Sequence, residues 1–173
     1  SRRQRQMCIR DRPRVQELLG DLMDRAENPS LAPYAKPGEV MLRLTAKGES
    51  PQDCQERMAP LFWDVRSRLG DCLYGVDVSS LEEVVITRLR QKGLTLSAAE
   101  SCTGGLIAKR ITDVPGASLV FMGGVVSYTD TVKHRVLGVP AEMLEEYGAV
   151  SAPVARAMAE GARRATTADL AVS

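Results

Sequence analysis

The first half of the chain alternates between segments with a helical spacing of apolar residues and shorter segments with a strand spacing. Apolar residues recur every three or four positions over 14–26 and again from the Ser50-Pro51 pair to Gly70, which predicts two amphipathic helices. The Ser-Pro pair is typical of a helix start, with serine as the N-cap. Apolar residues alternate with others over 39–46, and 72–76 is short and apolar, so we expect two strands.

The second half of the chain shows a repeated alternation of strands and helices. Short apolar segments predict strands over 94–99, 119–127 and 168–173. Expected helices cover 79–92, where Ser79 and Glu82 form a capping box, and then 106–111, 131–137, 140–147 and a longer segment from 151. This alternation predicts an α/β domain with a mainly parallel sheet. Such sheets bind ligands beyond the carboxyl ends of their strands.

These patterns divide the chain into three parts. Residues 1–13 are rich in arginine and have no apolar periodicity, so we expect a disordered or foreign terminus outside the fold. Residues 14–77 predict a small α+β connector domain with a KH-like or ferredoxin-like fold, in which 33–38 is an extended or turning link. Residues 78–173 predict a truncated three-layer α/β domain.

Composition restricts the classes of function. Aromatic residues make up 4% of the chain and the formal net charge is +1, which argues against a protein that binds nucleic acids or anionic membranes. No apolar run approaches the ~20 residues that span a bilayer. The four cysteines are scattered and there is one histidine, so no metal site is expected. The cysteines predict reduced thiols in a cytoplasmic protein.

The segment 94–105 joins an expected buried strand to a turn of small residues. A strand that passes through such a turn into a helix directs backbone N–H groups at the turn, which suits an anion or a developing oxyanion. Ser101, Cys102 and Thr103 add two hydroxyls and a thiol. Gly104-Gly105 would allow close approach. Alternatively, Ser101 or Thr103 only caps the helix. The segment matches neither the phosphate-loop motif nor the G-x-S-x-G elbow.

Several groups of residues occur in an order and spacing that is specific to one family. They are 98–105, 123–130 with Lys133, 137–139 and 148–151. In these residues the chain resembles the C-terminal domain of the CinA family, also called the PncC-type nicotinamide-nucleotide amidohydrolases. Upstream, 28–40 and 43–47 resemble the middle connector domain of full-length CinA proteins. The resemblance covers nearly everything after Pro13.

The resemblance implies that the chain is an internal fragment. A full CinA protein carries an N-terminal domain that resembles molybdopterin-binding folds. The family also continues past the position of Ser173 into a Gly/Pro-rich loop, which is expected to help build the nucleotide site. Many relatives carry asparagine at the position of Asp130.

The resemblance implies hydrolysis of the carboxamide of nicotinamide mononucleotide, which gives nicotinate mononucleotide and ammonia. An amide is a poor electrophile, so the enzyme needs an activated nucleophile and a stabilised oxyanion. Ser101 is the expected nucleophile and Lys133 the expected base, because a lysine kept neutral by burial serves this role in Ser-Lys hydrolases. Tyr128 is expected to relay the proton or to hold the leaving amide. The rival nucleophile is Cys102 beside His134.

The remaining expectations concern substrate and partners. The expected substrate-binding residues are Glu100, Cys102, Thr103, Gly104, Gly105, Gly124 and Asp130. We expect no cofactor and no metal, a small nucleotide as substrate, and a homo-oligomer that binds neither membranes nor nucleic acids. The competing hypothesis is a non-catalytic module that senses a nucleotide or binds a partner in competence or the response to DNA damage. Only the enzyme would release ammonia.

Overall fold

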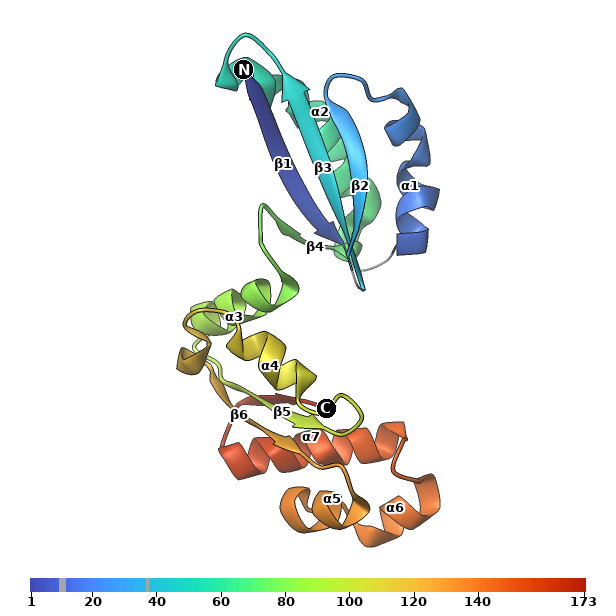
Figure 1. The fold of residues 1–173 in the computed structure, drawn as a ribbon, viewed down its shortest axis with the longest axis vertical. Helices are drawn as coiled ribbons and strands as arrows, with labels where there is room; N and C mark the ends of the chain where they lie inside the picture. The colour runs from blue at the N-terminus through green and yellow to red at the C-terminus, as the bar shows by residue number, and fades with distance from the viewer. Residues whose placement is uncertain (10–11, 37) are drawn as a thin grey trace. The chain divides into compact units, whose positions relative to one another are not determined.

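The computed structural model describes residues 1–9, 12–36 and 38–173 (Figure 1). The chain forms two compact units, 1–84 and 85–173. The first contains an antiparallel sheet with two helices, and the second contains a separate parallel sheet with helices. The expected mixed α/β class, with a small α+β part followed by an α/β part, is therefore confirmed.

The first unit is a four-stranded antiparallel sheet against which two helices pack (Figure 1). The strand order is β2-β3-β1-β4. Its core joins Leu42 and Leu44 of the sheet to Leu19 and Val65 of the two helices. The elements are β1 (Arg2–Ile9), α1 (Arg12–Arg25), β2 (Ser30–Lys36), β3 (Glu39–Lys47), α2 (Pro51–Leu69), the 3₁₀ turn η1 (Gly70–Cys72) and β4 (Leu73–Val76).

The expectation that 1–13 lies outside the fold is wrong for the strand β1. This strand is internal, between β3 and β4, and Met7 pairs with Leu42 on one side and with Val76 on the other. Met7 and Ile9 are fully buried. The arginine-rich start conceals this short apolar run, and its pairing partners lie far away in sequence. Residues 10–11 of the segment lie outside the described residues.

Two further local expectations can be compared with the first unit. The segment 33–38, expected as a link, instead lies largely within β2, where Tyr34 pairs with Met41 of β3; residue 37 lies outside the described residues. The predicted start of α2 is confirmed. The Ser50 hydroxyl accepts a hydrogen bond from the Asp53 N–H at 3.1 Å, and a proline occupies the first turn.

The second half of the chain contains a three-stranded parallel sheet with the order β6-β5-β7. The helix α3 is capped by Ser80, whose hydroxyl accepts from the Glu83 N–H, and not by Ser79 as predicted. The elements are α3 (Leu81–Lys92), β5 (Leu96–Glu100), α4 (Leu106–Thr112), the 3₁₀ turn η2 (Ala117–Leu119), β6 (Phe121–Val126), α5 (Asp130–Leu137), α6 (Ala141–Tyr147), α7 (Ala152–Thr166) and β7 (Leu170–Val172).

Helices cover both faces of this sheet and give it two separate cores. On one face Leu96 of β5 packs with Leu89 of α3 and Ile111 of α4. On the other face Ala99 of β5 packs with residues of α5 and α7, among them Val154. Leu96 and Ala99 lie on opposite faces, because successive side chains of a strand point to opposite faces and the two residues are three positions apart. The unit therefore has three layers, as expected.

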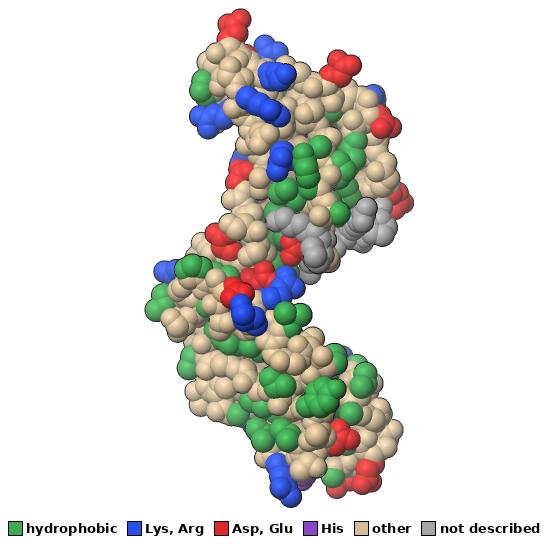
Figure 2. Space-filling view, in the orientation of Figure 1, with side chains coloured by type: hydrophobic (Ala, Val, Ile, Leu, Met, Phe, Trp, Pro, Cys, Tyr) green, Lys and Arg blue, Asp and Glu red, His purple; other side chains and the backbone are tan. Residues whose placement is uncertain are grey.

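The second unit also contains one very close contact, at Gly161, and several exposed hydrophobic side chains. A Cβ placed on Gly161 of α7 would lie 2.0 Å from the carbonyl oxygen of Leu137, so only glycine fits there. Hydrophobic side chains also reach the surface of this unit, as Figure 2 shows on one face. Leu106, Met122 and Val126 are large and exposed. They belong to α4 and to β6, which lies at the edge of the sheet.

Candidate active site

The candidate site begins where β5 ends. Ala98 lies against the α4 side of the sheet and Ala99 against the α7 side. By the same alternation Glu100 faces α4, and its side chain does contact that helix. Ser101 is the first residue beyond the strand and is partly buried. Two adjacent polar residues at the end of this strand therefore have different partners: Glu100 contacts α4, and Ser101 contacts Lys133.

The turn after Ser101 depends on two glycines. Gly104 and Gly105 have φ values of +61° and +102°, a region that residues with a Cβ rarely adopt. The Gly104 N–H donates to the carbonyl oxygen of Ser101 at 3.0 Å, which closes the turn. Gly105 is the N-cap of α4. The sequence predicted these glycines for close approach, and the structure gives a different reason for them, which is the backbone conformation of the turn.

Lys133 meets Ser101 just beyond the carboxyl end of β5. It lies in the first turns of α5, whose N-cap Thr129 accepts a hydrogen bond from the Val132 N–H. Its side chain is only 2% exposed. The Nζ atom donates to the Ser101 hydroxyl at 3.3 Å and to the Ser127 carbonyl oxygen at 3.0 Å. A hydroxyl and a buried amine in contact are the two parts of a Ser-Lys hydrolytic pair.

Three other residues named in the predictions lie close to Lys133 in the sequence. The Asp130 carboxylate lies 3.8 Å from Nζ, and its side chain is 60% exposed. The Tyr128 side chain is 74% exposed, and only its main-chain carbonyl approaches Nζ, at 3.5 Å. The expected role of the phenol in the proton path is thus not supported by a contact. His134 Nδ1 lies 2.8 Å from the carbonyl oxygen of Val139.

Glu100 is not placed to bind a substrate, which corrects the prediction. It is 2% exposed, and its two carboxylate oxygens accept the backbone N–H groups of Ile107 and Ala108, each at 2.8 Å. Burial acts to raise the pKa of Glu100, but these N–H donors, with the Thr103 hydroxyl and the Gly105 N–H, hold the pKa below its usual value. The carboxylate therefore anchors α4.

The other expected substrate-binding residues fall into two groups. Cys102 and Thr103 are exposed beside the nucleophile. In the part of the chain that the structure describes, their N–H groups make no hydrogen bond, so these donors remain for a ligand. Gly124 of β6 instead allows close packing, since a Cβ there would lie 3.3 Å from the Ala108 Cβ. We therefore assign Gly124 to the packing of α4 on the sheet.

Ser127 was not predicted as a functional residue. It is fully buried, its N–H donates to the Glu100 carbonyl oxygen at 2.8 Å, and its own carbonyl oxygen accepts from Lys133. The available signal is its place directly after the strand β6, because a polar residue at the carboxyl end of a parallel strand lies at the ligand-binding edge.

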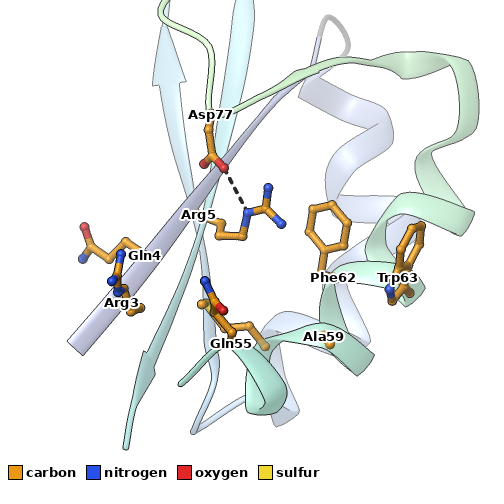
Figure 3. Close-up of a pocket in the computed structure, with 9 residues that line it drawn as sticks. Arg3, Gln4, Arg5, Gln55, Ala59, Phe62, Trp63 and Asp77 are labelled. Carbon is orange, nitrogen blue, oxygen red and sulfur yellow. Dashed lines mark hydrogen bonds and ion pairs between the residues drawn. The ribbon is translucent and has the colours of Figure 1, made fainter. Parts of the chain in front are cut away.

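A separate cavity of about 500 Å³ lies in the first unit (Figure 3). Arg5 and Asp77 line it and form an ion pair at 2.9 Å. The Arg5 guanidinium also lies 4.8 Å from the centre of the Phe62 ring, and Trp63 completes one wall. Arg3 also lines this cavity, and the nucleophile and lysine lie in the other unit.

Comparison with known families identifies both units. The CinA C-terminal domain matches residues 78–173, and the KH domain of the damage-inducible protein CinA matches residues 13–75. The chain belongs to the CinA family. The resemblance found in the motifs is therefore confirmed, and the KH-like alternative holds for the connector. The boundary between the matches lies at 75–78, close to the predicted one, while the compact units divide at 84.

Curated CinA relatives are longer than this chain. A CinA-like protein of Dictyoglomus turgidum is 46% identical over 159 residues, which are 92% of this chain and 39% of the relative. A CinA-like protein of Desulfovibrio desulfuricans is 52% identical over 151 residues, which are 87% of this chain and 35% of the relative. The chain therefore spans no more than about two fifths of these relatives.

Solved structures of the CinA superfamily match about half of the chain. A competence/damage inducible protein from Agrobacterium tumefaciens has 45% identity and a TM-score of 0.51, over 53% of this chain and 55% of that one. A CinA superfamily protein from Escherichia coli has 37% identity and a TM-score of 0.52, over 53% of both chains. Among the described residues, no helix has the length and apolar character needed to cross a membrane.

Proposed function

We propose that the second unit of this CinA-family chain is a nicotinamide-nucleotide amidohydrolase, which converts nicotinamide mononucleotide and water into nicotinate mononucleotide and ammonia. The observation that carries the proposal is the contact of 3.3 Å between Lys133 Nζ and Ser101 Oγ, with the lysine buried and held by the Ser127 carbonyl. The motif resemblance supplies the substrate class. The pair of side chains supplies the chemistry.

In the first step the Ser101 oxygen attacks the carboxamide carbon while its proton passes to the amine of Lys133. The carbonyl π electrons move to oxygen and form a tetrahedral oxyanion. The free N–H groups of Cys102 and Thr103 are the donors for this oxyanion, because the Ile107 and Ala108 N–H groups are already bound to Glu100. The C–N bond then breaks, and the Lys133 ammonium returns the proton to the departing nitrogen, which leaves as ammonia.

In the second step water hydrolyses the ester on Ser101. The water oxygen attacks the acyl carbon while Lys133 accepts a proton from that water. The C–O bond to Ser101 then breaks, and the serine oxygen takes the proton back from the lysine. The products are the carboxylic acid and the original enzyme, so one amine serves as base and acid in both halves of the reaction.

The test measures ammonia release from nicotinamide mononucleotide by the wild-type chain and by two variants at adjacent positions. Ser101→Ala should lower the rate by ~10³-fold or more, as the loss of a nucleophile does in comparable hydrolases. Cys102→Ala should retain activity, since its thiol is exposed beside the pair and is not in contact with Lys133. Activity that survives in Ser101→Ala and is lost in Cys102→Ala would overturn the proposal in favour of a thiol nucleophile.

The competing module hypothesis predicts a different result in the same experiment. A nucleotide sensor would bind nicotinamide mononucleotide in an equilibrium binding measurement but would release no ammonia. That outcome in a protein that continues past Ser173 through the Gly/Pro-rich loop of the family would overturn the enzymatic proposal.

A further inference from the structure

We propose that Glu100 is a positioning residue for the Ser101–Lys133 pair. Its buried carboxylate fixes α4 against the end of β5 and thereby holds the Ser101 hydroxyl at the lysine amine. The part of the test that measures kcat and KM rests on the proposed amidohydrolase function. A second readout below, the reactivity of Ser101 itself, does not.

The first observation is the placement of the Glu100 side chain. It is 2% exposed, and each carboxylate oxygen accepts one backbone N–H of α4, from Ile107 and from Ala108, at 2.8 Å. Hydrogen bonds to a charged acceptor are stronger than neutral ones and fix geometry more closely. The turn 101–105 is therefore fastened at both ends, at its start by the covalent bond to Glu100 and at its end by these contacts.

The second observation is that the main chain of Glu100 leads to the lysine. The Glu100 carbonyl oxygen accepts the Ser127 N–H at 2.8 Å and lies 3.4 Å from the Ser127 hydroxyl, which also donates to it. The Ser127 carbonyl oxygen in turn accepts from Lys133 Nζ at 3.0 Å. The contacts thus form a closed ring that runs from Ser101 through Glu100, Ser127 and Lys133 back to Ser101.

The surroundings exclude two more direct roles for this carboxylate. It cannot orient Lys133, because the carboxylate that approaches Nζ belongs to Asp130 on the exposed side. It cannot bind a substrate in this arrangement, because it is buried and both of its oxygens already accept N–H groups. What remains is control of position, and a displacement of 1 Å at a reacting group can cost a factor of ~100 in rate.

The test uses Glu100→Gln, which keeps the shape of the side chain but places an NH₂ group against one backbone N–H. The matched control is Asp169→Asn. Asp169 also accepts a backbone N–H with its carboxylate, from Thr95 at 2.8 Å, but at the opposite end of β5. Both changes remove a carboxylate–backbone contact close to one end of β5, and only the first lies at the pair.

Two readouts are measured on the wild type and on both variants, beside thermal melts. The first is the rate at which a fluorophosphonate labels Ser101, which reports the reactivity of the hydroxyl without any nucleotide. The second is kcat and KM for nicotinamide mononucleotide. Glu100→Gln should lower labelling and kcat by ~10-fold or more with KM within about twofold, since the serine is displaced and the substrate contacts are not. Asp169→Asn should leave labelling, kcat and KM within about twofold of wild type.

Each result decides between the two proposals. Labelling and kcat in Glu100→Gln equal to wild type would overturn the positioning role. Equal losses in both variants would also overturn it, because the effect would then follow stability alone. A wild type that is labelled at Ser101 but releases no ammonia refutes the substrate assignment, and the labelling comparison still tests Glu100. If Glu100→Gln melts below the assay temperature, Glu100→Asp is measured with the same expected losses, since its shorter side chain cannot reach both N–H groups.

Discussion

Lys133→Met separates the chemistry of the amine from its packing. Methionine has a similar length and volume, so it fills the same buried space without a proton acceptor for Ser101. The substitution removes the contact of 3.3 Å to the serine and the contacts to the carbonyl oxygens of Ser127 and Tyr128. The variant should fold, and its hydrolytic rate should fall.

The size of each effect follows from these contacts. Loss of a positioned general base costs ~10²- to 10⁴-fold in rate. This corresponds to about 3–5 kcal/mol of activation free energy. For folding, the buried Ser127 carbonyl loses a donor, which costs about 1–3 kcal/mol. Removal of a buried amine offsets part of that cost. The thermal midpoint should therefore shift by only a few degrees while the rate falls by orders of magnitude.

The assay combines single-turnover ammonia release with a thermal melt. The control is Lys109→Met, the same chemical change at an exposed lysine that pairs with Asp113. Lys109→Met should keep the wild-type rate and should lower the thermal midpoint no more than Lys133→Met does, because an exposed ion pair contributes little to stability. A Lys133→Met enzyme that retains its rate within threefold would refute the assignment of this lysine as base. Parallel losses in both variants would do the same.

Three further predictions concern stability. Gly105→Ala should lower the free energy of unfolding by about 1–2 kcal/mol in a denaturant titration, because its φ of +102° is strained for alanine. Gly161→Ala should cost about 1–3 kcal/mol or prevent folding, because the added Cβ would meet the Leu137 carbonyl at 2.0 Å. Burial acts to raise the pKa of Glu100, but N–H donors hold it below its ordinary value of 4.5. Its stabilising contribution is therefore complete above that pH and is lost as the pH falls through the lowered value, so melts of wild type and Glu100→Gln should converge in acid.

The sequence predicted the parts of the site that depend on local chemistry. The small-residue turn at 101–105 needs two glycines with positive φ, and a strand followed by such a turn and a helix is recognisable from residue types alone. The contact between Ser101 and Lys133 could not be predicted from local residue types, since 32 positions and a complete strand separate them. The family motifs supplied that pairing, because alternation of strands and helices predicts neighbours in a sheet but not which side chains meet.

The parts that were predicted wrongly depend on tertiary context. The strand β1 has a polar, arginine-rich first half, and its internal position follows from pairing with residues more than 30 positions away. Glu100 belongs to the family motif at 98–105 and was predicted to bind the substrate. The alternation along β5 separates it from Ser101, since Glu100 shares the face of Ala98, which packs against α4. Adjacent residues at the end of a strand can therefore belong to different environments.

The lysine and the serine meet because β5 and β6 are parallel neighbours, and parallel strands lie ~4.8 Å apart. The loop 113–116 precedes β6 and lies at the amino-terminal end of the strands, away from the serine and the lysine. Its length can therefore vary without moving either group. One residue inserted between Ser127 and Lys133 would instead turn the lysine by ~100° about the axis of α5 and withdraw the amine from the hydroxyl. Natural variation in chain length should thus accumulate on one side of this sheet and be absent from the other.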